Sequence, residues 1–358
     1  MANNRIFYAC QAVAIAPCFT AGNTMVAVHG VQSVGVNTTF NLEQAFELGQ
    51  IQIYENIENV PDIEVTLEKV LDGYPLIYHL SSPGADTSSL VSRAKERCCV
   101  ALGIYADDRD AVSGIPPVEI YMSGMYFSNL SYNLVTDGNC TESVTLVGNH
   151  KVWNTTGQKI TATNITALAN NVGTDEPKAL TSSSGGIQRR ENVLISASIL
   201  PLSMFGVTQS AVAGNGWDAT NGPKVHIQDC TISCDLSRDP IQELGRKAPY
   251  YRAPNYPVEV TCEFNAISVS GDFVSGYEEG RPDYVGTRNE GNNTSEERIK
   301  MVLQDGTVFD LGTKNRLSSV TYGGGDAGGG NVSMKYSYST YNDLTVLHKQ
   351  DPATSLRP

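Results

Sequence analysis

The chain has 358 residues, enough for about two domains, and 41% of them are hydrophobic, which is sufficient for a packed core. Charged residues make up only 18%, which argues against a disordered chain. With 25 basic and 38 acidic side chains the formal net charge is −13, so ordinary binding to DNA or RNA phosphates is disfavoured. We expect no membrane-spanning segment and no signal peptide, because long apolar runs and a charged leader are missing.

The eight cysteines are too sparse in a chain of this length to predict a disulfide scaffold. We expect them to be reduced thiols in a protein made in the cytoplasm. Cys230 and Cys234 are four residues apart in an alternating stretch, which predicts a shared core face of a strand rather than a zinc site. Cys98 and Cys99 are adjacent and lack the C-x-x-C spacing of a redox motif.

Alternation of apolar and polar residues predicts that most of the chain forms β-strands. Thr, Val and Tyr are abundant in these stretches and suit half-buried strand surfaces. In chain order, the alternating runs are 31–40, 63–68, 118–122, 143–147, 225–236, 258–264 and 332–338.

Two short helices are predicted between the strands. The first covers residues 89–102, with Thr87 or Ser88 as N-cap, and the second covers residues 295–303, with Thr294 or Ser295 as N-cap. Few helices among many strands favour a mainly β fold of the α+β type, in which the helices pack on a sheet. The side chains expected to face the core from the two helices are Leu90, Val91, Ala94, Cys98, Cys99, Ile299, Val302 and Leu303.

A polar stretch over residues 154–190, rich in Thr, Asn, Ser and Gly, divides the chain and predicts a linker or a long surface excursion. The net charge is negative before this stretch, positive within it and negative after it. The predicted organisation is an N-terminal arm or first strand (1–24), a first domain (25–153), the linker (154–190), a second domain (191–350) and a C-terminal tail (351–358).

The two halves of the sequence resemble each other at an offset of 196 positions. Glu47-Leu48-Gly49 then matches Glu243-Leu244-Gly245, and after the deletion of one residue 64–68 matches 259–263. Further on, 127–132 resembles 317–322. Shared β-propensity alone is the alternative explanation, but it does not account for matching gaps and turn residues. Further matched pairs are Gln32 with Gln228, Tyr54 with Tyr250, Asn59 with Asn255, and Pro61 with Pro257.

A duplicated β-domain has a physical consequence for assembly. An open sheet leaves unpaired backbone groups at its edges, and copies of a subunit can pair these edges and close a ring. Three copies of a two-domain chain would form a ring of six domains. The fused halves are then free to diverge and make contacts that identical domains cannot make.

Residues 46–56 and 61–73 carry a resemblance to structural proteins of tailed-phage tails, and the chain is most similar to the tail tube family. The resemblance is one of pattern, without an invariant signature, and extends over 25–153 and 191–350. It implies two tandem tail-tube-like β-sandwich or barrel domains, each with a flanking short helix and a long inter-ring loop. Such chains form trimeric, pseudo-hexameric rings whose inner strands make a continuous barrel.

The same resemblance implies a structural protein of the virion rather than an enzyme. Rings would stack into a tail tube, assembled in the cytoplasm of the bacterial host, through which DNA passes without specific binding. The implied partners are further copies of the chain, a tape-measure protein, a tail terminator, and baseplate or sheath proteins. An acidic lumen that repels phosphate is compatible with the net charge, although acidity also simply aids solubility.

The segments 49–61 and 246–257 join paired strands in the two halves and are the candidate inter-ring loops. The Tyr250-Tyr251-Arg252 stretch has a composition typical of interfaces. The candidate residues for ring stacking are Gln50, Tyr54, Glu55, Asn56, Glu58, Tyr250, Tyr251, Arg252 and Asn255.

No catalytic, cofactor or metal site is predicted. The five histidines do not occur at metal-ligand spacing, and the acidic cluster 107–110 lacks the spaced ligands of a calcium loop. The glycine-rich run 323–330 lacks the ending of a phosphate loop and is better explained as a hairpin tip. Two other functions remain open: a tail hub, adaptor or baseplate protein of the same two-domain design, and a β-rich adhesion or carbohydrate-active tail protein.

Overall fold

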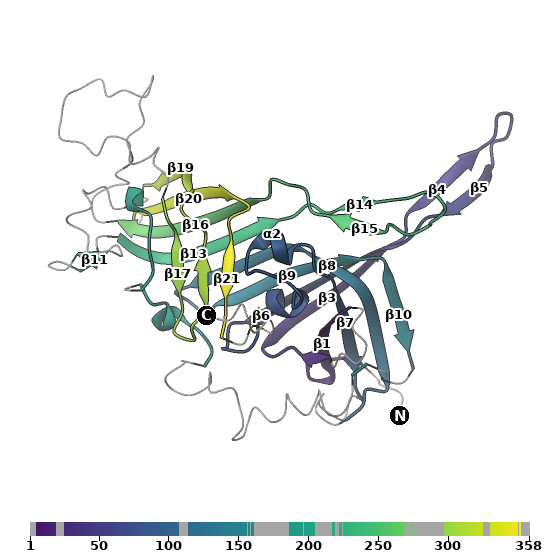
Figure 1. Cartoon of the computed structure of the whole chain (residues 1–358), viewed down its shortest axis with the longest axis horizontal. Helices are drawn as coiled ribbons and strands as arrows, with labels where there is room; N and C mark the ends of the chain where they lie inside the picture. The colour runs from purple at the N-terminus through teal and green to yellow at the C-terminus, as the bar shows by residue number, and fades with distance from the viewer. Residues whose placement is uncertain are drawn as a thin grey trace.

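The computed structural model of the chain (Figure 1) shows a mainly β protein with a few short helices, as the alternation predicts. In the part of the chain that it describes, no helix has the length and apolar character needed to cross a membrane. The described residues are 5–18, 25–106, 114–155, 157, 159–160, 186–195, 197–204, 217–218, 222–223, 225–268, 274, 297–324, 330–349 and 351.

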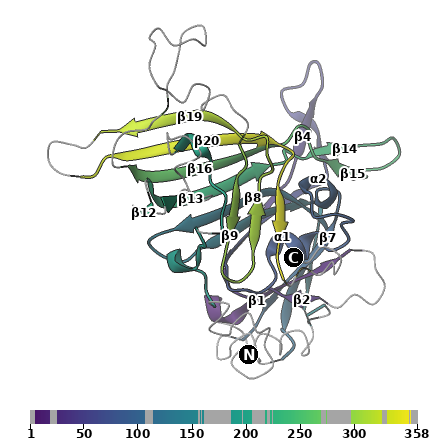
Figure 2. The same ribbon diagram turned by 60° about the vertical axis from the view of Figure 1, so that its left-hand side comes forward.

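A long antiparallel ladder dominates the fold and is part of a 12-stranded sheet. Figure 2 shows five of its strands, β19, β20, β16, β13 and β8, one above the other. Each of the seven alternating sequence runs lies on one of the ladder strands, so these predictions are confirmed. Across the sheet, the order is β3 (Val31–Thr39), β6 (Asp62–Val70), β9 (Thr141–Gly148), β8 (Val118–Val135), β13 (Val225–Asp235), β16 (Glu259–Ser268), β20 (Ser333–Tyr341) and β19 (Arg316–Gly323).

Strand β8 is 18 residues long and belongs to two layers. Its C-terminal part pairs with β9 and β13 in the ladder. Its N-terminal part pairs with β7 (Cys98–Ile104) and β10 (His150–Asn154), and β1 (Gln11–Pro17) and β2 (Val26–Ala27) extend this second layer from β7. Side chains of β1 and β7, such as Val13 and Val100, share one core with Val65 of β6. The second layer therefore covers the first half of the ladder.

A smaller sheet covers the second half of the ladder. It consists of β17 (Lys300–Val302), β18 (Val308–Asp310) and β21 (Thr345–Leu347). Phe309 of this sheet lies 4.5 Å, between ring centroids, from Tyr132 of β8. Helices α1 (Ile77–Ser81) and α2 (Leu90–Arg93) pack beside it, and every residue of α1 is buried. One apolar core thus extends along a single face of the whole ladder.

Two hairpins leave the ladder at the same end. The first arm, residues 40–61, contains β4 (Leu42–Phe46) and β5 (Ile53–Glu58), and projects beyond the rest of the molecule (Figure 1). The second arm, residues 236–257, contains β14 (Asp239–Ile241) and β15 (Tyr251–Ala253) and lies closer to the ladder. The remaining short elements are η1 (Tyr8–Cys10), η4 (Arg190–Asn192), η5 (Leu202–Met204), β11 (Trp217–Asp218) and β12 (Gly222–Pro223).

Both predicted helices need correction. Of residues 89–102, only Leu90–Arg93 is helical; it is capped by Ser89, whose Oγ accepts a hydrogen bond from the Ser92 N–H at 3.3 Å. The chain then enters β7, where every residue is buried because both faces of the strand are covered, so the sequence shows no alternation. The described part of the second predicted helix, residues 297–303, contains strand β17 instead, and Ile299, Met301 and Leu303 are buried at a period of two.

Cys18 and Cys99 form a disulfide across a sequence separation of 81, which corrects the expectation that all eight cysteines are reduced. Strands β1 and β7 bring the two residues together, because the ladder pairs Pro17 with Cys98. The other six cysteines are free and buried. Among them, Cys230 and Cys234 lie on one core face of β13, as their spacing predicts.

The ladder contains two sets of strands with the same internal order. The first set is β3-β6-β9-β8 and the second set is β13-β16-β20-β19. A β-bulge lies at Gln32 in β3 and at Gln228 in β13, and in both strands the Gln Nε2 donates to the carbonyl oxygen two residues earlier, at 3.3 and 3.2 Å. A second bulge lies at Ser128 in β8 and at Ser318 in β19. Strand order and both irregularities therefore match between the two sets.

The pairing also corrects the sequence alignment of β6 with β16. Val34 pairs with Leu67, whereas the matching Cys230 pairs with Phe264, two residues beyond the aligned Cys262. A slip of two residues leaves every side chain on the same face of a strand, so alternation alone does not detect it. The acidic cluster 107–110 and most of the segments 154–190 and 323–330 lie outside the described residues.

Candidate assembly surfaces

The ladder face opposite the core is polar. Ser143, Ser131, Ser233, Thr261 and Ser339 are consecutive partners across five adjacent strands, and the hydroxyls of Ser233 and Thr261 lie 2.8 Å apart. We call this surface the open face. Its acidic residues outnumber its basic residues Arg316 and Lys335, and Lys335 forms an ion pair with Glu263 at 2.9 Å. The acidic residues of the open face are Asp62, Glu64, Glu68, Asp229, Asp235, Glu259 and Glu263.

The ladder ends in two edge strands. Among the described residues, β3 pairs only with β6 and β19 pairs only with β20, so these two strands form the edges of the ladder. The two sets meet inside the chain through β8 and β13, with seven residue pairs from Asp229–Val135 to Asp235–Asn129. We call this contact the internal junction. It joins the last strand of one set to the first strand of the next.

The first arm exposes an unusual number of large apolar side chains. Leu48 and Ile51 at its tip are fully exposed. Its four charged residues are all glutamates, because no Lys or Arg occurs between residues 40 and 61. So many exposed apolar side chains on one hairpin are typical of an interaction surface. The other exposed apolar residues of the arm are Phe40, Leu42, Phe46, Ile53, Tyr54 and Ile57.

The tips of the two arms have the same local structure. Leu48 and Leu244 are both fully exposed. Each is followed by a glycine with a left-handed backbone, Gly49 with φ 94° and Gly245 with φ 83°, a conformation that disfavours other residues. The preceding glutamates make matching side-chain contacts, Glu47 with Gln50 at 2.8 Å and Glu243 with Arg246 at 3.2 Å.

The second arm, unlike the first, is held on the ladder of its own chain. Arg238 Nε donates to the carbonyl oxygen of Phe127 at 2.9 Å, and its guanidinium lies 5.1 Å from the Tyr126 ring and 5.3 Å from the Phe127 ring. Tyr251 packs edge-on against Tyr126 with 5.6 Å between the ring centroids. Burial lowers the pKa of Arg238 to about 10, which still leaves it charged at neutral pH.

Arg252 completes this contact. It forms an ion pair with Asp62 of β6, and its Nε donates to Asn149 Oδ1 at 3.1 Å. Partial burial raises the pKa of Asp62, but hydrogen bonds from Asn41 and Arg252 outweigh it, so the pKa is lowered. The second arm is therefore fixed to the first set by both arginines and by Tyr251.

The structure divides the sequence-predicted stacking residues into three groups. The five residues of the first arm are exposed, but they lie on a turn and on strand β5, so the segment 49–61 is the second half of a hairpin rather than a loop. Tyr250 and Asn255 are exposed on the second arm. Tyr251 and Arg252 are engaged inside the chain. The sequence analysis missed Arg238 and its platform on β8, because nothing local connects residues so distant in the chain.

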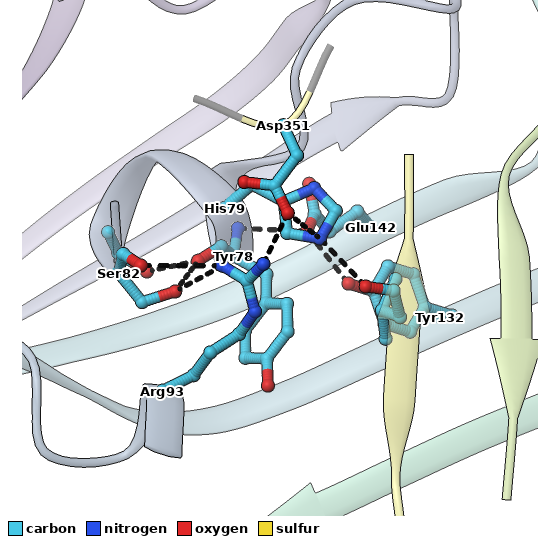
Figure 3. A network of polar contacts seen from close by, with 9 residues as sticks. Tyr78, His79, Ser82, Arg93, Tyr132, Glu142 and Asp351 are labelled. Atoms are coloured by element: carbon cyan, nitrogen blue, oxygen red, sulfur yellow. Dashed lines mark hydrogen bonds and ion pairs between the residues drawn. The ribbon is translucent and has the colours of Figure 1, made fainter. Parts of the chain in front are cut away.

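A buried polar network joins Asp351, near the C-terminal end, to helices α1 and α2 of the first half of the chain (Figure 3). Arg93 of α2 forms an ion pair with Asp351 and donates to Ser82 Oγ at 3.0 Å, and its guanidinium lies 5.3 Å from the Tyr78 ring. Arg93 and Asp351 are fully buried. Asp351 belongs to the segment that the sequence analysis assigned to a C-terminal tail. Because the network links α2 to the end of the second half, it clamps the two halves together.

His79 and Glu142 also belong to this buried network. Burial and the nearby Arg93 hold the pKa of His79 well below its usual value, and its Nε2 donates to the Val346 carbonyl at 3.0 Å. Glu142 accepts hydrogen bonds from the backbone N–H of Ile77 at 2.7 Å and from the Tyr132 hydroxyl at 3.1 Å. Burial raises the pKa of Glu142. All of these side chains are buried, so the network joins elements rather than presenting groups to a substrate.

Comparisons with known proteins give structural likenesses only. No protein-family model and no curated protein matches the chain. A chain of the anti-feeding prophage baseplate is 11% identical, with a TM-score of 0.32 over 44% of this chain and 100% of that chain. A chain of the tube-terminating cap of the anti-feeding prophage is 14% identical, with a TM-score of 0.31 over 43% and 94%. A chain of the sheath–tube complex of an extracellular contractile injection system is 10% identical, with a TM-score of 0.31 over 42% and 93%.

Proposed function

We propose that the protein is a structural subunit of a phage-tail-like tube, in which three copies close a ring and rings stack into a channel. The observation that carries this proposal is the relation between the internal junction and the two edges. The junction pairs β8 with β13, and the free edge strands β19 and β3 occupy the matching places in the other set. An edge contact between two copies therefore repeats a contact that the chain already makes within itself.

The matching bulges define the register of this edge contact. They relate β3 to β13 by 196 positions and β8 to β19 by 190 positions. The internal pair Ser233–Ser131 then corresponds to Asn37 of one copy and Thr321 of the next. Likewise, Ile232–Tyr132 corresponds to Val36 and Tyr322. Closing the ladder in this way leaves no free edge, which is the physical benefit of a ring.

In such a ring the open face lines the channel, because the core face is already covered by the second layer and by β17, β18 and β21. The channel wall then carries rows of hydroxyls and an excess of carboxylates. Carboxylates repel DNA phosphates, and serine and threonine hydroxyls offer no fixed positive charge to hold them. DNA would pass without specific binding. The tips of the first arms, where Leu48 and Ile51 are fully exposed at one end of the ladder, are suited to contact the next ring.

A cysteine pair tests the ring. The double variant Asn37→Cys/Thr321→Cys places thiols on the predicted neighbours of two copies, and the six free cysteines of the described residues are buried and give little background. Oxidation is expected to yield covalent dimers and trimers and no larger ladder, as resolved by denaturing electrophoresis. The control Asn37→Cys/Ser333→Cys places the second thiol at the far end of β20 and is expected to stay uncross-linked.

Negative-stain microscopy of the unmodified protein separates a tube from a hub of the same design. Stacked rings of indefinite length support a tube subunit, whereas single rings favour a hub, adaptor or baseplate role. A protein that stays monomeric at every concentration, with no cross-link in the cysteine pair, would overturn the ring itself.

A further inference from the structure

We infer that the first arm of each copy lies on the second strand set of the neighbouring copy, with Glu55 facing Arg316 and Leu42 packing on Leu317. This inference rests on the proposed ring and specifies how neighbouring copies recognise each other. It follows from comparing the docked second arm with the free first arm, residue by residue.

The two arms superimpose in hydrogen-bond register. Ala45 pairs with Glu55 in the first arm, and Ile241 pairs with Tyr251 in the second arm, at the same offset of 196 positions. Glu55 therefore occupies the place of Tyr251, and Leu42 occupies the place of Arg238.

The platforms under the arms also correspond. The bulges at Ser128 and Ser318 align β8 with β19, so Tyr126 corresponds to Arg316 and Phe127 to Leu317. In the internal junction the Leu236 N–H donates to the Ser128 carbonyl at 2.8 Å, where the second arm leaves β13. By the same correspondence, the first arm leaves β3 next to Ser318 in β19 of the neighbouring copy.

The two side-chain contacts of the second arm on β8 both have counterparts of different chemistry for the first arm on β19 of the neighbouring copy. The Tyr251–Tyr126 contact becomes Glu55 opposite Arg316, which is an exposed acid facing an exposed base. The Arg238–Phe127 contact becomes Leu42 opposite Leu317, which is an apolar pair. Leu42 is 61% exposed in the single chain, and this neighbour would cover it. Each member of a pair differs from its counterpart in a way that suits its new partner.

This arrangement also explains how a ring avoids the wrong order of domains. The platform on β8 is filled by Tyr251 and Arg238 of the same chain, so it is not open to Glu55 and Leu42 of another copy. Complementary charge at one junction and aromatic packing at the other thus distinguish the contact between copies from the contact within a copy.

Charge reversal tests the pair directly. Glu55→Arg and Arg316→Glu each place two like charges at the junction, and Glu55→Arg/Arg316→Glu restores opposite charges. Each single variant is expected to raise the concentration needed for half-assembly by about tenfold or more, because a closed ring repeats the junction in every copy. The double variant is expected to assemble within about threefold of the unmodified protein. Sedimentation velocity over a concentration series measures the assembly, and circular dichroism checks the fold.

The matched control is Glu43→Arg, which makes the same change of charge on the same arm and removes an exposed hydrogen bond that Glu43 accepts from Asn59 Nδ2 at 2.9 Å. Its counterpart Asp239 makes no polar side-chain contact among the described residues. It is expected to assemble like the unmodified protein. If the unmodified protein forms rings and the single reversals assemble equally well, or if the double variant fails to recover, the arm contact is wrong and the ring survives. If the unmodified protein forms no rings, both proposals fail.

Discussion

The first and second arms are hairpins of the same register with matching tips, yet their surroundings are opposite. The second arm is fixed by Arg238, Tyr251 and Arg252 on the first strand set. The first arm projects away from its own chain and exposes most of its apolar side chains. Since the two arms share their local geometry, their difference does not come from the hairpin itself. It comes from the platform, which the chain supplies for the second arm and a neighbouring copy would supply for the first.

The composition of each arm fits this difference. The second arm carries two arginines that meet an acid and a backbone carbonyl on the first set. The first arm carries only glutamates as charged groups. Exposed apolar side chains on the first arm therefore indicate a missing neighbour rather than a poorly folded hairpin.

The largest effect is expected at the clamp that keeps the two halves, and hence the second arm and its platform, in place. Arg93→Met leaves the carboxylate of Asp351 buried without its cation, so the free energy of unfolding should fall by about 3–5 kcal/mol. Chemical denaturation measures this change. The control Arg246→Met removes the exposed pair with Glu243 at an arm tip and should change the stability by less than about 0.5 kcal/mol. Equal losses for the two variants would contradict the assigned role of the clamp.

A smaller effect is expected from matched positions of the two arms. Arg238→Ala removes the donor to the Phe127 carbonyl and the stacking on two rings, and should destabilise the monomer by about 1–3 kcal/mol. Leu42→Ala, at the matching position of the first arm, should change monomer stability by less than about 0.5 kcal/mol, because Leu42 is exposed there. Denaturation at concentrations below assembly compares the two. Similar losses would show that the first arm is already docked in the single chain.

The smallest effect concerns pH and the contact between α1 and the residue after β21, where the rings of His79 and His348 lie 6.1 Å apart. Burial, with Lys69 and Lys349 nearby, lowers the pKa of His348 from 6.5 to about 3. Below about pH 6.5 the unfolded chain therefore binds a proton at His348 that the folded chain does not bind. The contribution of His348 to the free energy of unfolding is fully present above that pH and is lost as the pH is lowered towards 3. Between pH 6.5 and 5.5, His348 should account for about 1 kcal/mol of this fall.

His348→Gln should remove that share of the pH dependence, while the similarly buried His79 keeps its own contribution. Thermal unfolding at a series of pH values measures the slope. An unchanged slope in the variant would mean that His348 does not stay neutral in the folded protein.

The strands were predictable where one face of a strand is buried and the other is open. In β6, β13 and β20 buried and more exposed side chains alternate, and the sequence shows the matching alternation of apolar and polar residues. β7 is covered on both faces, so its apolar run shows no alternation, and because it follows a short helix the sequence predicts a longer helix there. β17 was misassigned because three apolar residues at mixed spacing fit either period over so short a stretch.

The candidate surfaces divide in the same way. The exposed residues of the first arm could be named from the sequence, because turn residues and an internal match at Glu47-Leu48-Gly49 are local signals. The docking of Arg238 and Arg252, the disulfide of Cys18 with Cys99 and the ion pair of Arg93 with Asp351 join residues far apart in the chain. Such pairs leave no local pattern.

The amino-acid sequence by itself determined the mainly β character and the internal match between the halves, because side-chain alternation and turn residues act over a few neighbouring positions. Only the tertiary structure decided which strands are adjacent, that β8 and β13 join the two sets, and that β3 and β19 are the edges of the ladder formed by the described residues. Strand adjacency depends on hydrogen bonds between distant backbone segments, and every non-proline residue offers the same backbone donor and acceptor. The order of the ladder is therefore set by packing of the whole chain.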